Sequence, residues 1–207
     1  MPPSTTRRYS QSVRAQSAED TGRRIVESFL ARLMRQWFDE ITLDAVAADA
    51  GVTVQTVVRR FGGKDGLLSV AVKVLADRIN AQRVAPPRDL ERLVENLVAD
   101  YEQNGDMVMR LLSSEGKHAA LKEVLDFGRG QHRQWVTGAF EENLKMLDEA
   151  DRARAVDALI IATDVYTWKL LRRDMEHSPE ETRERILRLI RAILFDFLSA
   201  KNHDEKP

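Results

Sequence analysis

The stretch from Ile41 to Lys64 reads ITLDAVAADAGVTVQTVVRRFGGK, and it decides the fold. Two short apolar patterns of helical period follow Thr42 and Thr53, which are residues typical of helix N-caps. Gly51 lies between the two patterns and can adopt the left-handed φ that a tight turn requires. The stretch therefore predicts a helix-turn-helix, a motif whose second helix can enter the major groove of DNA.

The second of these helices, from Thr53 to Arg60, divides into an apolar and a polar side. We expect four residues to pack inward, namely Val54, Val57, Val58 and Phe61. Glutamine can pair with adenine and arginine with guanine, and a threonine methyl can contact thymine. We expect the outward residues to be Gln55, Thr56, Arg59 and Arg60.

The helix N-termini at Thr42 and near Lys64 can offer backbone N–H groups to phosphates, and Lys64 adds a positive charge. The predicted DNA-binding residues are thus Thr42, Thr53, Gln55, Thr56, Arg59, Arg60 and Lys64. An ordinary helical hairpin with solvated charges has the same spacing and is the alternative at this point.

The rest of the chain also shows helical rather than alternating apolar patterns, so we predict an all-α protein. The first helix is expected to start near Ser17, with Asp20 three residues on. Further helices are expected at about 64–83, 88–113, 118–127, 129–147, 151–173 and 179–200. The predicted organisation is a flexible basic arm (1–16), a helix-turn-helix domain with a connecting helix (17–83), a larger helical domain (84–200) and a polar tail (201–207).

Composition excludes several classes of protein. The 207 residues are 43% hydrophobic and 31% charged and include no cysteine, which rules out disulfides, thiolate zinc sites and cysteine nucleophiles. No apolar run reaches the roughly 18 residues of a membrane span, and no secretory signal is evident, so we expect a cytoplasmic protein without a membrane partner. Residues 1–83 carry a net charge of +4 and residues 84–207 a net charge of −5, which suggests a basic module joined to an acidic one.

The segment from about 23 to 68 resembles the DNA-binding domain of the TetR family of bacterial transcriptional regulators. The matching residues are Thr42, Val46-Ala47, Ala50-Gly51-Val52-Thr53, Thr56-Val57-Val58, Phe61, Lys64 and Leu67-Leu68. The chain departs from the family pattern at Val58, where a tyrosine is usual, at Arg60, where histidine is frequent, and at Gln55, where a small residue is common.

The resemblance implies a three-helix DNA-binding domain followed by a helical domain for ligand binding and dimerisation. It further implies a homodimer on a near-palindromic double-stranded operator, an unknown small-molecule effector, and most often repression. Aromatic and methionine side chains of the acidic half are the candidate ligand contacts: Met107, Phe127, His132, Trp135, Tyr166 and Trp168. The apolar faces of the last two long helices are the candidate dimer interface: Val156, Leu159, Ile160, Ile186, Ile190, Ile193 and Phe197.

No cofactor, metal site or catalytic residue is predicted. His118 and His132 with Glu115 make a weak case for a metal, and no nucleophile motif occurs. Two alternatives remain from other classes: an architectural DNA-binding protein without an effector, and a helical enzyme or small-molecule carrier.

Overall fold

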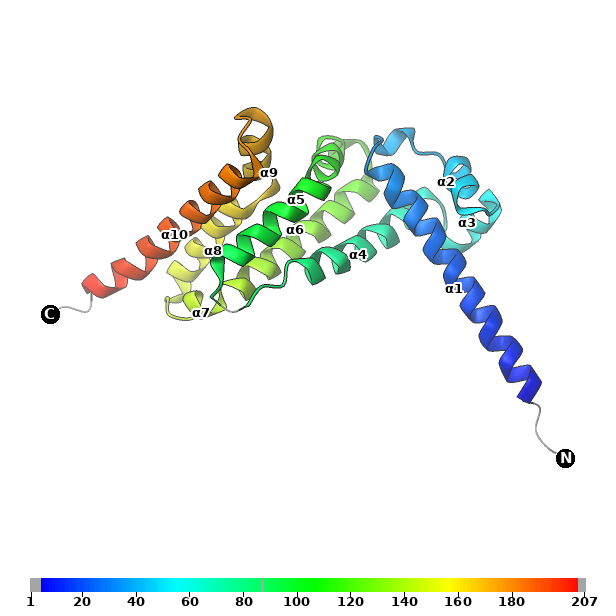
Figure 1. The fold of residues 1–207 in the computed structure, drawn as a ribbon, viewed down its shortest axis with the longest axis horizontal. Coiled ribbons are helices and arrows are strands. Elements are labelled where there is room, and N and C mark those ends of the chain that lie inside the picture. Colours follow the sequence, from blue (N-terminus) through cyan, green and yellow to red (C-terminus); the bar gives the residue numbers. More distant parts are fainter. Residues whose placement is uncertain (1–4, 87, 205–207) are drawn as a thin grey trace. The chain divides into compact units, whose positions relative to one another are not determined.

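The structure is a computed structural model that describes residues 5–86 and 88–204, with side chains for 16–86 and 88–199. The described residues form helices and no strands, which confirms the all-α prediction. The chain divides into two compact units, Met1–Val74 and Leu75–Pro207. The division falls inside α4 (Lys64–Gln82), the helix that connects them (Figure 1).

The first unit is a small bundle. It contains α1 (Thr5–Leu33), the short 3₁₀ helix η1 (Phe38–Glu40), α2 (Leu43–Ala50), α3 (Val54–Phe61) and the first part of α4. The apolar stripe of α1 packs against α2, and α2 packs against α3. Their inward side chains are the buried set of this unit: Ile25, Val26, Phe29, Leu30, Leu33, Phe38, Ile41, Val46, Ala47, Ala50, Val57, Leu67, Leu68 and Ala71.

The second unit is built on longer helices. They are α5 (Leu90–Ser113), α6 (Ala119–Ala139), α7 (Glu141–Leu144), α8 (Glu149–Thr163), α9 (Val165–Lys169) and α10 (Pro179–Asp204), with η2 (Glu115–Lys117) and the π-helical η3 (Leu170–Asp174) between them. In Figure 1, α8 and α10 lie side by side, and α10 also packs on α5. One apolar core joins α5, α6, α8, α9 and α10.

The predicted start of the first helix was wrong. Residues 5–16 belong to α1 rather than to a flexible arm, since no proline or glycine interrupts the chain there. The Ser17 carbonyl lies inside the helix and accepts a hydrogen bond from the Thr21 hydroxyl at 2.8 Å. At the other end, α10 extends to Asp204, so the polar tail is helical up to that residue. Residues 1–4 and 205–207 of the predicted arm and tail lie outside the described residues.

The predicted helix bounds were also wrong at two places inside the second unit. Gly128 and Gly130 do not break α6, because glycine lowers helix stability by only about 1 kcal/mol and the rest of the pattern continues through it. Conversely, the apolar pattern of 151–173 continues through a real break at Asp164. The Asp164 backbone is extended, and its carboxylate accepts a hydrogen bond from the Tyr166 N–H at 2.9 Å, which starts a new helix.

Gly66 fixes the corner between α3 and α4. A Cβ at this position would lie 1.9 Å from the carbonyl oxygen of Phe61, the last residue of α3. Backbone atoms cannot approach that closely, so any side chain at residue 66 forces α3 away from the start of α4. The sharp corner therefore depends on a glycine here.

The variant Gly66→Ala should lower the free energy of unfolding by about 1–3 kcal/mol, the usual cost of overpacking. Gly128→Ala is the matched control, because a Cβ there meets nothing within 4 Å and alanine favours a helix interior by about 0.5–1 kcal/mol. Urea unfolding followed by circular dichroism compares the two variants. Equal stability of both would contradict the proposed close approach.

Candidate functional site

The turn between α2 and α3 has the predicted caps. The Thr42 hydroxyl accepts a hydrogen bond from the Ala45 N–H at 3.2 Å, and the Thr53 hydroxyl accepts one from the Thr56 N–H at 3.3 Å. Gly51 ends α2 with φ 65° and ψ 41°, in the left-handed region. These local interactions set the direction in which α3 leaves the turn, and the helix-turn-helix is confirmed.

The side chains of α3 divide more unevenly than the sequence predicted. Val57 is 0% exposed and is the only residue of α3 that points straight into the unit, with Val54 and Phe61 half-buried beside it. The opposite side carries exposed residues at i, i+3, i+4 and i+7, which we call the outer ridge: Gln55, Val58, Arg59 and Gly62.

The inward position predicted for Val58 was wrong. Val58 is 44% exposed, because the 100° turn per residue that points Val57 inward carries the next side chain to the flank. The outward prediction for Thr56 holds only in part. Thr56 is half-buried, and its hydroxyl lies 3.0 Å from the Thr53 hydroxyl, so it is engaged in the N-cap.

Arg60 is exposed, as predicted, although it lies to one side of the outer ridge. Its guanidinium covers Gly22 of α1, where an added Cβ would be 2.5 Å from Nε and Nη2. The reason is rotational: position 60 follows the buried Val57 by three residues and so lies on the side of α3 that faces α1. The absence of a side chain at Gly22 makes room for the guanidinium.

Lys64 begins α4 and is half-buried. Its Nζ lies 4.3 Å from the centroid of the Phe38 ring and 3.5 Å from the Asp39 carbonyl oxygen. Burial lowers the pKa of Lys64, while the charges of Asp39 and Asp65 act in the opposite direction. The ammonium group is thus held against η1, while the Lys64 backbone begins α4, whose first N–H groups carry the positive end of the helix dipole.

In the second unit, the side chain of Arg83 is buried among polar and aromatic partners. Its Nε donates to a carboxylate oxygen of Asp100 at 2.9 Å, and the pair is almost fully shielded from solvent. The guanidinium also lies 4.9 Å from the ring centroid of Tyr101 and 5.2 Å from that of Trp135. Asn104 donates to the other oxygen of Asp100 at 2.7 Å, so each group in this cluster has a partner.

His132 joins this cluster as a neutral ring. Burial, followed by the charge of Arg83, lowers the pKa of His132 to about 4. The Thr163 hydroxyl donates to the Leu159 carbonyl at 2.7 Å and lies 3.1 Å from His132 Nε2. Since that hydroxyl has given its only proton, Nε2 carries the ring proton, and Nδ1 accepts from Arg83 at 3.4 Å.

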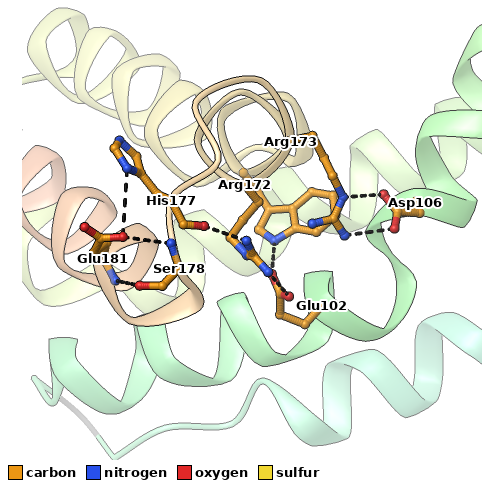
Figure 2. Close-up of polar contacts among 8 residues, drawn as sticks. Glu102, Asp106, Arg172, Arg173, His177, Ser178 and Glu181 are labelled. Atoms are coloured by element: carbon orange, nitrogen blue, oxygen red, sulfur yellow. Dashed lines mark hydrogen bonds and ion pairs between the residues drawn. The ribbon is translucent and has the colours of Figure 1, made fainter.

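A second polar cluster fastens η3 to α5 (Figure 2). Arg172 donates to both oxygens of Glu102, at 2.7 and 2.9 Å, and Arg173 does the same to Asp106, at 3.0 and 2.8 Å. The indole N–H of Trp168 donates to Glu102 at 2.7 Å. Burial alone would raise the pKa of Glu102, but the hydrogen bonds from Arg172 and Trp168 outweigh it and lower that pKa.

Trp168 is fully buried because α5 has a glycine opposite it. A Cβ at Gly105 would lie 2.4 Å from the indole ring, so this glycine makes room for Trp168. Arg172 also donates to the His177 carbonyl, next to the capping pair of Ser178 and Glu181 at the start of α10 (Figure 2). The cluster thereby orders the segment between α9 and α10.

No known protein-family profile matches the chain. Over 151 residues the chain is 28% identical to an uncharacterised HTH-type transcriptional regulator of Mycobacterium bovis, a match that covers 70% of this chain and 76% of that relative. Among solved structures it resembles a putative TetR-family transcriptional regulator from Rhodococcus sp., with a TM-score of 0.71, 18% identity, and coverage of 85% of this chain and 99% of the other. A TetR-family transcriptional regulator from Streptomyces coelicolor gives a TM-score of 0.68 and 20% identity, with coverage of 90% and 85% respectively.

This chain has the TetR-family fold. The resemblance inferred from residues 23–68 is therefore confirmed, and so is the fold class, an N-terminal helix-turn-helix domain followed by a helical domain. Among the described residues, no group of three or more histidine, aspartate or glutamate side chains is placed to hold a metal ion. Within the same residues, no helix is long and apolar enough to span a membrane.

The residues predicted to contact a ligand are spread over several environments of this TetR-family fold. His132 and Trp135 lie together, with ring centroids 5.5 Å apart. Met107 and Trp168 are buried in packing, Phe127 is half-buried, and Tyr166 is 55% exposed. Sequence reasoning missed the polar members Arg83, Asp100 and Asn104. The available signal was the i, i+4 spacing of Asp100 and Asn104 on the apolar side of α5.

Four of the seven predicted dimer-interface residues are buried inside a single chain, and for the three half-buried ones the interface stays a prediction. Val156, Leu159, Ile186 and Ile190 belong to the core of a single chain, and Ile160, Ile193 and Phe197 pack half-buried against it. The helical period identified an apolar stripe but could not say whether it met the same chain or another. On the outer sides of α8 and α10, the large exposed apolar residues are Ile161, Leu189 and Phe195, with exposures of 69%, 45% and 74%.

The lowered pKa of His132 predicts a loss of stability in acid. Between pH 6.5 and about 4 the unfolded chain binds a proton at this residue and the folded chain does not, so stability falls as the pH falls through that window. The loss attributable to His132 is about 3 kcal/mol over the whole window. His132→Gln keeps hydrogen-bonding groups but cannot titrate, so its urea-unfolding free energy should fall less between pH 7 and pH 5 than that of the unmodified protein. Parallel pH profiles would contradict the buried neutral ring.

Proposed function

We propose that this chain is a TetR-family transcriptional regulator that binds an operator in double-stranded DNA. The observation that carries the proposal is the outer ridge, where a glutamine and an arginine stand exposed on the second helix of a helix-turn-helix. These side chains can pair with adenine and guanine edges in the major groove. The regulator relatives support the same function.

The phosphate contacts are proposed for groups at helix starts. Thr42 caps α2 and Lys64 begins α4, so each lies where free backbone N–H groups and the helix dipole favour an anion. Thr53 and Thr56, at the start of α3, can add hydroxyl contacts to the backbone of the same groove. Arg60 is exposed beside Gly22 and can add a further positive charge for a phosphate.

We propose that the protein acts as a homodimer through the outer sides of α8 and α10. Ile161, Leu189 and Phe195 expose apolar area there, and a second copy related by a two-fold axis would cover it in a four-helix bundle. Two reading helices on such a dimer fit a near-palindromic operator with half-sites one helical turn apart.

We further propose that a small molecule bound in the second unit releases the protein from DNA, which makes it a repressor. The aromatic and polar cluster around Trp135 and His132 supplies apolar surface with a few hydrogen-bonding groups, the combination that ligand sites use. Such an effector must weaken DNA binding by the factor by which DNA weakens effector binding. Calorimetric titration of candidate compounds into free and operator-bound protein tests that equality.

Selection of bound sequences from random double-stranded DNA tests the main proposal. A palindromic consensus with adenine and guanine in each half-site is the expected result. Architectural binding would instead give retention on DNA without a consensus, and an enzyme or carrier would give no retention.

The variant Lys64→Ala, which removes the ammonium group, should weaken binding to all DNA sequences about equally. It should also make the salt dependence shallower: the slope of the logarithm of the binding constant against the logarithm of salt concentration should fall by about 0.9 per half-site. Gln55→Ala or Arg59→Ala should instead change the preferred bases, at about 1–3 kcal/mol for each lost contact. Lys117→Ala in the second unit is the control for a lost surface charge. Fluorescence anisotropy titrations over a salt series separate these effects, and a salt slope in Lys64→Ala equal to that of Lys117→Ala would contradict the phosphate role.

Phe195→Glu and Ile161→Glu should each give a folded monomer, because a carboxylate on the outer sides of α8 or α10 would be buried unpaired in the dimer. Val84→Glu is the control, since Val84 is 73% exposed and lies outside both helices. Ile190→Glu should unfold the chain instead, because that side chain is in the core. Sedimentation velocity with circular dichroism measures assembly and folding, and a monomeric unmodified protein would refute the interface.

A further inference from the structure

One side chain of the outer ridge differs in chemistry from its neighbours. Val58 stands between Gln55 and Arg59 with 44% of its surface exposed, and the ridge continues to Gly62, which has no side chain. Packing does not require a valine here, because Val57 already fills the inward position. Helix formation does not require a valine at this position either, because β-branched residues form helices less readily than alanine or arginine.

Isolated exposed apolar residues are common on proteins, so exposure alone assigns no role to Val58. The position of Val58 on the outer ridge does indicate a role. The flanking amide and guanidinium have the chemistry that reads adenine and guanine, and the one further distinctive group in the major groove is the 5-methyl of thymine. An exposed isopropyl group is the natural partner for that methyl, because their contact removes apolar area from water on both sides.

The helix geometry sets where such a contact falls. Val58 lies three residues after Gln55, a displacement of about 4.5 Å along the axis of α3. Successive base pairs of DNA are about 3.4 Å apart, so the two side chains meet neighbouring base pairs when α3 lies along the groove. The open position at Gly62, with φ 76°, leaves the far end of the ridge free for close approach to the DNA.

We propose that Val58 is a specificity-determining residue that contacts the 5-methyl group of a thymine in the base pair next to the one read by Gln55. This inference rests on the proposed function. It requires each half-site of the operator to carry a thymine at that position. Cytosine is disfavoured there, because its amino donor would lose water and find no acceptor on a valine.

The test uses the full chain and the operator obtained by selection. Each thymine of the operator is replaced in turn by 2′-deoxyuridine, which removes the methyl group and keeps every hydrogen bond. Dissociation constants are measured for the unmodified protein, Val58→Ala, Val58→Thr and the control Val84→Ala, which removes the same atoms from an exposed valine of the second unit. Alanine favours the helix, so Val58→Ala is expected to fold.

Binding should be sensitive to 2′-deoxyuridine at one thymine position in each half-site. Replacing that thymine should weaken binding of the unmodified protein and of Val84→Ala about fourfold, or about fifteenfold when both half-sites are replaced, which is the worth of burying a methyl group. Val58→Ala should lose this sensitivity, and Val58→Thr, which keeps one methyl, should retain part of it.

Equal sensitivity to deoxyuridine in Val58→Ala and the unmodified protein, or a consensus without thymine beside the base that changes in Gln55→Ala, overturns the inference and leaves the proposed function standing. A selection that yields no consensus overturns both, because no base is then read.

Discussion

Removing a guanidinium from water costs several kcal/mol unless carboxylates, ring faces or hydrogen-bond acceptors replace the lost solvent. In the second unit, Arg83 receives all three kinds of partner, from Asp100, from the rings of Tyr101 and Trp135, and from His132. These partners come from α5 and α6, and Thr163 ties His132 to α8. The apolar core could tolerate small shifts between these helices, whereas the directional bonds to one buried charge cannot.

The first unit depends on a different constraint, the brevity of α3. A helix of eight residues makes about two turns, so it can anchor itself through very few side chains. Val57 is the only fully buried one, and caps at Thr53 and Gly62 replace the stability that a longer apolar face would supply. Because so few side chains of α3 are buried, nearly the whole outer half of the helix is available for contact with another molecule.

Much of this arrangement followed from local rules. The caps at Thr42 and Thr53 and the left-handed Gly51 could be predicted because each depends on a few neighbouring residues. Positions that depend on rotation about a helix axis or on distant partners could not. Val58 was misplaced by one step of helical rotation, and Ile186 and Ile190 were assigned to an interface because an apolar stripe does not reveal which chain covers it. The break at Asp164 was missed because its extended backbone ends one helix and its carboxylate caps the next without disturbing the apolar period.

The three tryptophans occupy three unlike surroundings. Trp37 is 45% exposed at the start of η1, Trp135 stacks on a histidine beside a buried guanidinium, and Trp168 is sealed from solvent with its indole N–H on a carboxylate. Indole emission shifts to shorter wavelength as water is excluded and is quenched by a protonated imidazole in contact. The chain thus contains three intrinsic fluorescent probes, one in the first unit and two in separate parts of the second. The emission of each can be removed by substituting that tryptophan alone with phenylalanine.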